Sequence, residues 1–395
     1  MGVSIGMVGL GAFGSGFVEL FKNHPQVDRI ALCDREPNRV ATFAEREDFA
    51  DKFDPKDAYG SLEEICRSDI EALVIITQHW LHGWQAIEAL RAGKHVYAAV
   101  PLLSVPDADE ILDCCDQLIE AVRATGRHFM FGETTYYRPE AQYGRRKAAE
   151  GAFGDFVYAE GEYFHDFNSG RYTLKQVRDH RHASTAGQEW ARKLQSYWDR
   201  GIVNGPMHYP THSTAGPISV MGAHPTRVWA LPYRDRTDDA FFAHELANET
   251  ALFEMSNGAA MRICEYRQIA ARGRESFRVY GTEGSFEDGQ LRRRGGAAEE
   301  PTVEQMREPL PKEVAAAWQA AAGEEKDFCG GHGGSHAYLV HEFVDALAHD
   351  RMPAVNAWEA VRYMAAGAVA HKSALAGGEL LDVPDWGDAP AHPGA

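Results

Sequence analysis

Three glycines near the N-terminus constrain the fold of this chain more than any other feature. Residues 3–8 (VSIGMV) form a short apolar run typical of a buried strand, and the segment GLGAFG follows directly at residues 9–14. A helical pattern then begins at about Ser15 and continues to about Lys22. Between a strand and a helix, Gly9 permits a tight turn, Gly11 lets the backbone approach a pyrophosphate, and Gly14 allows close packing of helix on strand. The spacing therefore predicts a dinucleotide-binding unit.

An acidic residue stands where such a unit contacts the ribose of its ligand. The second strand is predicted over Arg29–Asp34 (RIALCD), and Asp34 lies 20 residues after Gly14. A carboxylate at this point accepts hydrogen bonds from both ribose hydroxyls and repels a 2′-phosphate, so it favours NAD over NADP. Arg35 weakens that preference because a guanidinium can hold a phosphate. We expect NAD as the cofactor.

Strands and helices continue to alternate as far as residue 132. Strands are predicted over Ala72–Thr77, Lys94–Ala98 and His128–Gly132, with helices over Trp80–Ala92 and Ala108–Thr125. This alternation predicts an α/β fold in which a doubly wound parallel sheet of the Rossmann type is covered on both faces. At 395 residues the chain is long enough for two domains. We expect a Rossmann domain over residues 1–132 and a second domain over residues 133–395.

Charge and cysteine usage exclude several classes of function. The formal net charge of −18 disfavours nucleic acid and anionic membranes as partners, since both favour a basic face. No run of about 18 apolar residues predicts a membrane span, and the N-terminus lacks the basic region of a signal peptide. The six cysteines are scattered, without metal-ligand spacing, as in a reducing compartment. We expect a cytoplasmic protein that binds no metal.

The order of several short motifs resembles the Gfo/Idh/MocA family of NAD(P)-dependent sugar and inositol oxidoreductases. These motifs are GLGAFG, CD, TQHWLH and AGKHVYAAVPL in the first half, then VYGTEGSFE at 279–287 and HKSALAGGELLDVPD at 371–385. The resemblance implies a second domain of α+β type with an open, mostly antiparallel sheet, a small sugar-like substrate and a homodimer or homotetramer. It also implies a set of cofactor contacts. These are Gly9, Gly11, Ala12, Phe13, Gly14, Asp34, Arg35, Thr77, Gln78, His79, His82, Val100 and Pro101.

Two departures from the family pattern point to an unusual reaction. Where most members carry Glu-Lys-Pro, with a lysine that helps move the proton of the reacting hydroxyl, this chain reads Ala99-Val100-Pro101, and valine carries no proton. Residues 206–213 read PMHYPTHS, with a histidine pair in place of the usual Asp and His. Together with GEYFHD at 161–166, this resembles the NAD-dependent glycosidases of the superfamily. The best-known of these are α-N-acetylgalactosaminidases, and some related enzymes take sulfonated sugars.

The same motifs supply the candidate catalytic residues. His212 is the first candidate for the proton relay, because an imidazole titrates near neutral pH. His208 lies four residues earlier and is either a substrate contact or a structural residue. On an extended strand Tyr163 and His165 point to one face and Asp166 to the other, which favours the first two as site residues alongside Tyr209. A tyrosine can act as the base if a neighbouring cation lowers its pKa.

Candidate substrate contacts come from basic and histidine-rich segments. The stretch 171–200 is rich in basic residues, and Arg178 and Arg181 within it are candidates for an anionic group on the sugar. The alternative is a solvated helix with ion pairs. The glycine-rich segment 330–336 predicts a loop in which His332 and His336 contact sugar hydroxyls, with metal binding as the rival interpretation. We also expect Arg138 and Asp166 to contact the substrate.

Three functions remain open from the sequence. The favoured one is a glycosidase that oxidises C3 of the sugar, eliminates the C1 substituent, adds water and re-reduces the ketone, with NAD recycled. This route needs no pair of carboxylates of the usual glycosidase type. The alternative is a sugar or inositol dehydrogenase with net NADH formation, in which His212 and a tyrosine replace the lysine. The third is an NAD-binding regulator without catalysis.

Overall fold

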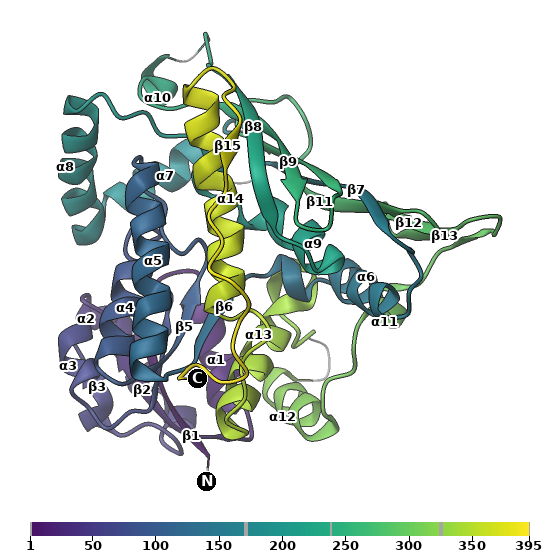
Figure 1. The fold of residues 1–395 in the computed structure, drawn as a ribbon. Coiled ribbons are helices and arrows are strands. Elements are labelled where there is room, and N and C mark those ends of the chain that lie inside the picture. The colour runs from purple at the N-terminus through teal and green to yellow at the C-terminus, as the bar shows by residue number, and fades with distance from the viewer. Residues whose placement is uncertain (1, 170–172, 238, 324–326, 395) are drawn as a thin grey trace.

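Two β-sheets, joined and covered by helices, make up the molecule (Figure 1). The computed structural model describes residues 2–169, 173–237, 239–323 and 327–394. The first sheet is built from the N-terminal third of the chain, and the second from residues 156–299 with a short strand from 381–382.

The first sheet is doubly wound and parallel, as predicted. Its strands run in the order β3-β2-β1-β4-β5-β6, and every neighbouring pair is parallel. The strands are β1 (Val3–Val8), β2 (Val27–Cys33), β3 (Ala58–Tyr59), β4 (Ala72–Ile75), β5 (His95–Ala99) and β6 (Phe129–Gly132). The connecting helices are α1 (Ser15–Asn23), α2 (Pro37–Ala44), α3 (Leu62–Cys66), α4 (His82–Arg91) and α5 (Ala108–Thr125). All residues of β4 and β6 are buried, as expected for strands covered on both faces.

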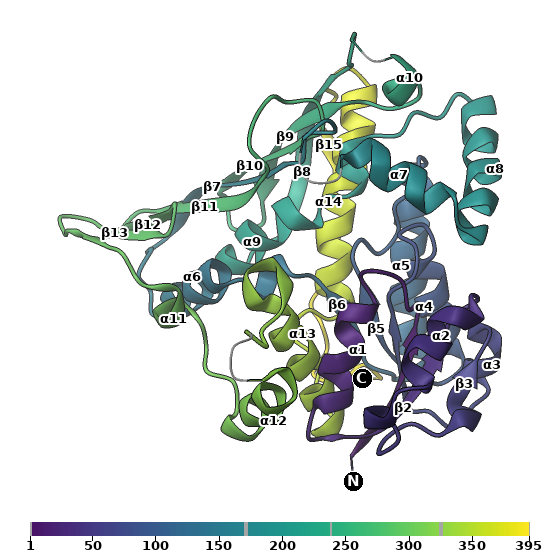
Figure 2. The ribbon, with the colours of Figure 1, turned by 180° about the vertical axis from the view of Figure 1, so that it is seen from behind.

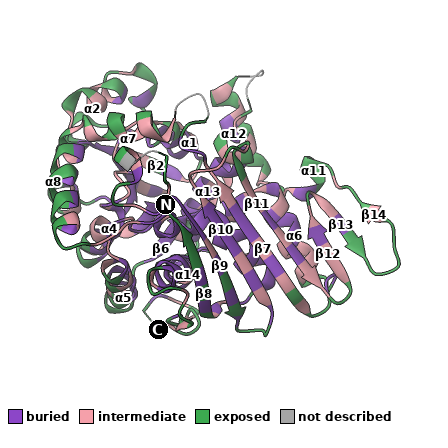
Figure 3. Ribbon diagram, turned by 90° about the horizontal axis from the view of Figure 1, so that it is seen from above, coloured by how far each residue is buried: buried purple, intermediate pink, exposed green. Residues whose placement is uncertain are grey.

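The second sheet is open and mostly antiparallel, which confirms the architecture implied by the family resemblance. Its order is β14-β13-β12-β11-β7-β10-β9-β8-β15, and the β7–β10 pair is parallel while the other pairs are antiparallel. The strands are β7 (Phe156–Phe164), β8 (Pro225–Tyr233), β9 (Asn248–Met255), β10 (Ala260–Tyr266), β11 (Arg274–Gly281), β12 (Gly284–Glu287), β13 (Gln290–Arg293), β14 (Ala298–Glu299) and β15 (Leu381–Asp382). Seen from above, the central strands carry buried residues, whereas the β13–β14 edge is largely exposed (Figure 3).

Helices that follow β6 in the chain cover this sheet and also reach the first one. Helix α9 packs on β7 and β11, and α14 runs between the two sheets, against β8 on one side and α5 on the other (Figures 1 and 2). Helices α12 and α13 return to pack on α1. These helices are α6 (Pro139–Ala149), α7 (Leu174–His182), α8 (Thr185–Asp199), α9 (Thr211–Met221), α10 (Asp239–Phe242), α11 (Val303–Met306), α12 (Lys312–Ala322), α13 (Gly331–Ala348) and α14 (Ala357–Leu375). The later part of the chain therefore completes the cover of the first sheet, and the domain boundary at residue 132 stays a prediction.

In the parts of the chain that the structure describes, no helix has both the length and the apolar character needed to cross a bilayer.

Candidate functional site

The carboxyl edge of the first sheet gathers the residues from which the site is built. All strands of a parallel sheet point the same way, so the segments that follow them meet at one edge, where ligands bind in such folds. Strands β1, β2, β4, β5 and β6 end at this edge and are followed by Gly9, Asp34, Thr77, Val100 and Glu133.

The glycine turn has the geometry that the sequence predicts. Gly9 has a φ of 92°, in the left-handed region that favours glycine, and a Cβ there would lie 2.4 Å from the Ile76 carbonyl oxygen. A Cβ on Gly14 would lie 2.1 Å from the Gly9 carbonyl oxygen. Glycine is therefore required at both positions for the β1 end, the turn and α1 to pack this closely.

A cavity of about 370 Å³ opens beside this turn. Six of the predicted cofactor contacts line it, namely Gly9, Gly11, Asp34, Arg35, Thr77 and Gln78. The other predicted contacts do not line it. They are Ala12, Phe13, Gly14, His79, His82, Val100 and Pro101. His82 instead braces the β5 end, since its Nδ1 lies 3.0 Å from the Pro101 carbonyl oxygen. The volume lies within the range of about 300–1,000 Å³ that is usual for ligand sites.

Asp34 is fixed at the rim of this cavity. Its Oδ2 accepts a hydrogen bond from the Leu10 amide (2.8 Å) and its Oδ1 from the Glu36 amide (2.9 Å). The Arg39 guanidinium lies 3.4 Å from Oδ2. The glycine turn, the cavity and this carboxylate together fit a dinucleotide whose ribose lies at Asp34.

A cluster of tyrosines and histidines forms where the second sheet meets the first. The Tyr163 ring lies 5.2 Å from the His212 ring and 6.4 Å from the Tyr209 ring, measured between centroids. The Tyr209 hydroxyl is 3.4 Å from the Val100 carbonyl oxygen, so the cluster adjoins the β5 end. The His332 ring lies 6.3 Å from the His212 ring. The structure thus brings together predicted site residues from β7, α9 and α13.

His212 is paired with a carboxylate that the sequence analysis missed. Its Nδ1 lies 3.2 Å from Oε1 of Glu133, which is fully buried, and the same oxygen accepts the Thr135 amide at 2.7 Å. Burial opposes the charged imidazole, but the charge and hydrogen bond of Glu133 outweigh it and raise the pKa of His212. Because Nδ1 of His212 is bound to Glu133, Nε2 is the ring nitrogen that can contact a substrate. The sequence feature that could have identified Glu133 as a site residue is its position directly after the predicted strand at 128–132.

Tyr163 and His165 form a second pair, on the same face of the chain as predicted. The Tyr163 hydroxyl is 2.7 Å from His165 Nδ1. Burial lowers the pKa of His165 to about 4, so its imidazole is neutral at physiological pH and can accept a hydrogen bond from the tyrosine hydroxyl. The Arg267 guanidinium lies 4.6 Å from the Tyr163 ring, yet burial outweighs this cation and raises the pKa of Tyr163. The neighbouring cation thus lowers the pKa of Tyr163, but burial makes the net shift a rise in the protein without substrate.

The glycine-rich segment at 330–336 closes the cluster from α13. His332, Gly333 and Gly334 all have positive φ, so this first turn of α13 is not helical. His332 Nδ1 and His336 Nε2 lie 3.0 Å apart, and the His336 ring packs on Phe17 of α1 at 4.5 Å. Burial lowers the pKa of His336 to about 4. Neutral imidazoles here can exchange hydrogen bonds with sugar hydroxyls.

Three predicted residues are held by the protein away from this cluster. His208 Nδ1 lies 3.0 Å from Asn204 Oδ1, and its ring packs on His371. The Asp166 oxygens accept from the Ser169 hydroxyl and the Ile269 amide. The Arg178 guanidinium stacks on Phe241 and lies 3.8 Å from Glu245. Their roles at the substrate stay predictions that none of these contacts supports.

Two predicted basic residues lie close enough to act on the cluster. Arg138 is ion-paired with Glu275. Its positive charge acts to lower the pKa of both His212 and His332, although the net shift of His212 is upward because of Glu133. Arg181 on α7 lowers the pKa of Tyr209, although burial of that ring dominates. Of the other basic residues between 171 and 200, Arg171 lies outside the described residues. Arg267, which the sequence analysis missed, stands on the segment after β10, and the parallel β7–β10 pairing that brings it to Tyr163 is not readable from the sequence.

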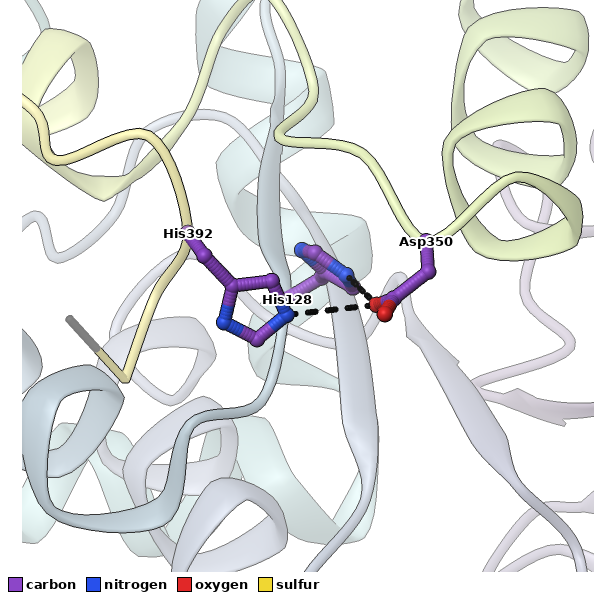
Figure 4. Close-up of side chains that lie close together, drawn as sticks. All are labelled: His128, Asp350 and His392. Atoms are coloured by element: carbon purple, nitrogen blue, oxygen red, sulfur yellow. Dashed lines mark hydrogen bonds and ion pairs between the residues drawn. The ribbon is translucent and has the colours of Figure 1, made fainter.

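Among the described residues, one group has the spacing of metal ligands, and it lies outside the tyrosine–histidine cluster. Asp350 Oδ1 is 2.9 Å from His128 Nε2 and 3.3 Å from His392 Nε2 (Figure 4). These hydrogen bonds tie the C-terminal tail to the start of β6 and to the end of α13. Asp350 and His392 are exposed, and the absence of a metal from this protein stays a prediction.

Comparison with known proteins agrees with this geometry. Residues 3–124 match the oxidoreductase family model for the NAD-binding Rossmann fold, and residues 145–380 match the model for its C-terminal alpha/beta domain. Glycosyl hydrolase family 109 protein 1 of Bacteroides fragilis (strain YCH46) is 35% identical over 170 residues, which are 42% of this chain and 35% of that protein. A glycosyl hydrolase family 109 protein of Shewanella sp. (strain W3-18-1) is 28% identical over 222 residues, 55% of this chain and 43% of that protein. The chain thus matches less than half the length of these relatives.

Solved structures share the fold along nearly the whole chain. The aldose-aldose oxidoreductase from Caulobacter crescentus has a TM-score of 0.70 at 17% identity, with 97% of this chain and all of that chain covered. Levoglucosan dehydrogenase in complex with NADH and L-sorbose has a TM-score of 0.72 at 18% identity, with 98% of this chain and all of that chain covered. At such identities the likeness concerns the fold alone. With both family models matched over most of its length, the chain belongs to the Gfo/Idh/MocA oxidoreductase family.

Proposed function

We propose that this protein is an NAD-dependent glycosidase, which cleaves a glycosidic bond by transient oxidation at C3, elimination, water addition and re-reduction. One observation carries the proposal: the site holds two separate proton-transfer pairs side by side. His212 with Glu133 is one, and Tyr163 with His165 is the other, with the Tyr163 and His212 rings 5.2 Å apart.

The two pairs match the two protons that this reaction must move. Oxidation at C3 releases the proton of the C3 hydroxyl, and elimination then removes the proton at C2 while the C1–O bond breaks and the departing alcohol gains a proton. A plain dehydrogenation releases only the first. His212 Nε2 accepts the hydroxyl proton while Glu133 holds the ring by Nδ1. Tyr163 removes the C2 proton as a tyrosinate, whose charge the Arg267 guanidinium stabilises, after its own proton has left to solvent through His165.

The cofactor site supplies the redox half of the reaction. NAD, when bound, accepts and later returns the hydride of the sugar carbon. Gly9 and Gly11 would hold its pyrophosphate and Asp34 its adenosine ribose. Val100 stands where most members of the family carry lysine, so proton transfer falls to His212.

The substrate that fits best is a glycoside with an anionic group. The charge of Arg181 lowers the pKa of both Tyr209 and His165, which supports a position of this guanidinium near the cluster. A guanidinium there attracts a carboxylate or sulfonate on the sugar. The Arg178 guanidinium is held by Phe241 and Glu245, so Arg181 is the stronger of the two candidates.

The relatives named glycosyl hydrolase family 109 support the glycosidase, whereas the dehydrogenases with this fold support the alternative of net sugar oxidation. A panel of neutral, uronic and sulfonated aryl glycosides, incubated with enzyme and a trace of NAD, separates the two. We expect aglycone release in large excess over the NAD supplied, with no lasting NADH absorbance. Accumulation of NADH without aglycone, once NAD is raised, would establish the dehydrogenase instead.

A further inference from the structure

A helix pair that follows β7 in the chain reaches across to the cofactor cavity. Helices α7 and α8 leave the second sheet and lie beside α5 and above the first sheet (Figures 1 and 2). The residues that begin α8, Ser184, Thr185 and Ala186, line the same cavity as Asp34 and Glu36. One wall of the predicted adenosine pocket is therefore contributed by a segment more than 140 residues further along the chain.

Polar contacts fasten the start of α8 to the rim of the cavity. Arg35 and Glu189 form a two-point ion pair with both N–O distances at 2.9 Å. The Thr185 hydroxyl donates to Glu36 Oε1 at 3.2 Å. Exposed contacts of this kind contribute little individually.

A buried contact behind them holds α8 more firmly. The Trp80 and Trp190 rings stack face to face, with centroids 4.9 Å apart and planes 7° from parallel, and these residues are only 4% and 6% exposed. One turn further along, Glu110 of α5 accepts hydrogen bonds from Lys193 (2.8 Å) and from the Tyr197 hydroxyl. A stacked aromatic pair at such burial is the strongest of these contacts.

We propose that α7 and α8 form a clamp that retains NAD between turnovers. The inference rests on the proposed function, since a cofactor that is recycled on the enzyme has no need to leave after each reaction. With the clamp closed, the adenosine half of the ligand is covered by the start of α8 and can leave only when the Trp80–Trp190 stack opens. The clamp also selects the ligand. Arg35, which follows Asp34 and lines the cavity, is already bound by Glu189, whose charge repels a 2′-phosphate.

The test is the rate at which bound NADH dissociates, followed by stopped-flow fluorescence after mixing with excess NAD and without sugar. Trp190→Ala removes the stack, and Glu189→Arg places two cations together without touching the buried contact. We expect the dissociation rate to rise about tenfold or more for Trp190→Ala and about threefold for Glu189→Arg. Gln195→Ala is the matched control, because Gln195 lies on the same helix and bonds only to Asp199 in the contacts seen here. Its rate should stay within twofold of the original.

Unchanged dissociation rates in both variants would overturn the clamp. If Trp190→Ala fails to fold, Glu189→Arg decides the question, since its site is at the surface. The readout involves no sugar chemistry, so a failed clamp leaves the glycosidase proposal standing. A chain that proves to be a dehydrogenase would still give an interpretable dissociation rate.

Discussion

At the scale of single residues, the site depends on which groups are charged. Glu133 favours the protonated form of His212, because its charge and its hydrogen bond raise the pKa of that imidazole. A general base must be neutral to act, so activity governed by His212 rises with pH through this raised pKa.

Replacing Glu133 with glutamine tests this dependence. Glu133→Gln removes the charge but keeps the shape, so burial then dominates and the pKa of His212 falls. We expect the acidic limb of the kcat/KM profile to move to lower pH, with kcat reduced about a hundredfold because the ring is no longer held by an anion. A pH profile of aglycone release measures both. An unshifted acidic limb would mean that another group titrates there.

Replacing Tyr163 with phenylalanine separates the two proton transfers. Tyr163→Phe keeps the ring between Arg267 and His212 but removes the hydroxyl that contacts His165. Aglycone release should fall about a hundredfold or more, while one equivalent of bound NADH still forms on adding substrate. Tyr158→Phe, on the same strand and bonded to Glu160, is the control and should keep full activity. Equal loss of NADH formation and aglycone release in Tyr163→Phe would assign both protons to one relay.

At the scale of elements, the glycine turn offers a matched pair of substitutions. Gly14→Ala forces a methyl group to within 2.1 Å of the Gly9 carbonyl, so β1 and α1 must separate and NAD affinity should fall about a hundredfold or more. Gly16→Ala, two residues later in α1, meets no atom within 4 Å. It should raise the free energy of unfolding by about 0.5–1 kcal/mol. Calorimetric titration measures the NAD affinity of each variant, and thermal unfolding measures the change in stability. Equal NAD affinity in both variants would contradict the assigned role of Gly14.

Local patterns predicted five of the six strands of the first sheet, because each rests on burial and turn chemistry within a short window, but β3, α2 and α3 were not predicted. Helix α5 has the predicted bounds, and the other predicted elements agree to within two residues. The pairing of strands that lie far apart in the chain could not be predicted from such local patterns. The β7–β10 pairing that brings Arg267 over Tyr163 joins residues about 100 apart, and the irregular turn that aims His332 at His212 depends on three successive positive φ angles.

The candidate site was predicted in part for the same reason. Tyr163, His165, Tyr209 and His212 were found because they lie in two short motifs, and the structure brings them together. Glu133 was missed although it follows a predicted strand, because a lone carboxylate after a strand does not indicate its partner. His208 shares the motif of His212, but the chain turns at Tyr209 and Pro210 before α9 begins, which leaves the His208 ring against His371.

At the scale of the whole molecule, one sheet face carries apolar side chains that the described residues leave exposed. Trp229, Leu231 and Tyr233 alternate along β8, and Leu252 pairs with Trp229 across to β9. All four are more than 40% exposed. Apolar patches of this kind mark association sites. The predicted homodimer or homotetramer would form through this face.

Leu252→Glu tests the association. We expect light scattering after gel filtration to give the mass of a single chain, 43.7 kDa, with little change in Tm because the side chain is 46% exposed. Val303→Glu, at an exposed apolar residue on α11, should leave the oligomer intact. A mass unaffected by Leu252→Glu would place the interface elsewhere.

In the proposed reaction the two sheets cooperate: the first sheet holds the cofactor, and the second sheet and α9 supply a proton relay for C2 besides the one for C3. The most direct measurement is hydrolysis of an aryl glycoside substrate in deuterium oxide, followed by mass spectrometry and proton NMR of the released sugar. We predict one solvent deuterium at C2, because the proton removed by Tyr163 is replaced from solvent. Released sugar with no deuterium at C2 would contradict elimination and assign the cleavage to another mechanism.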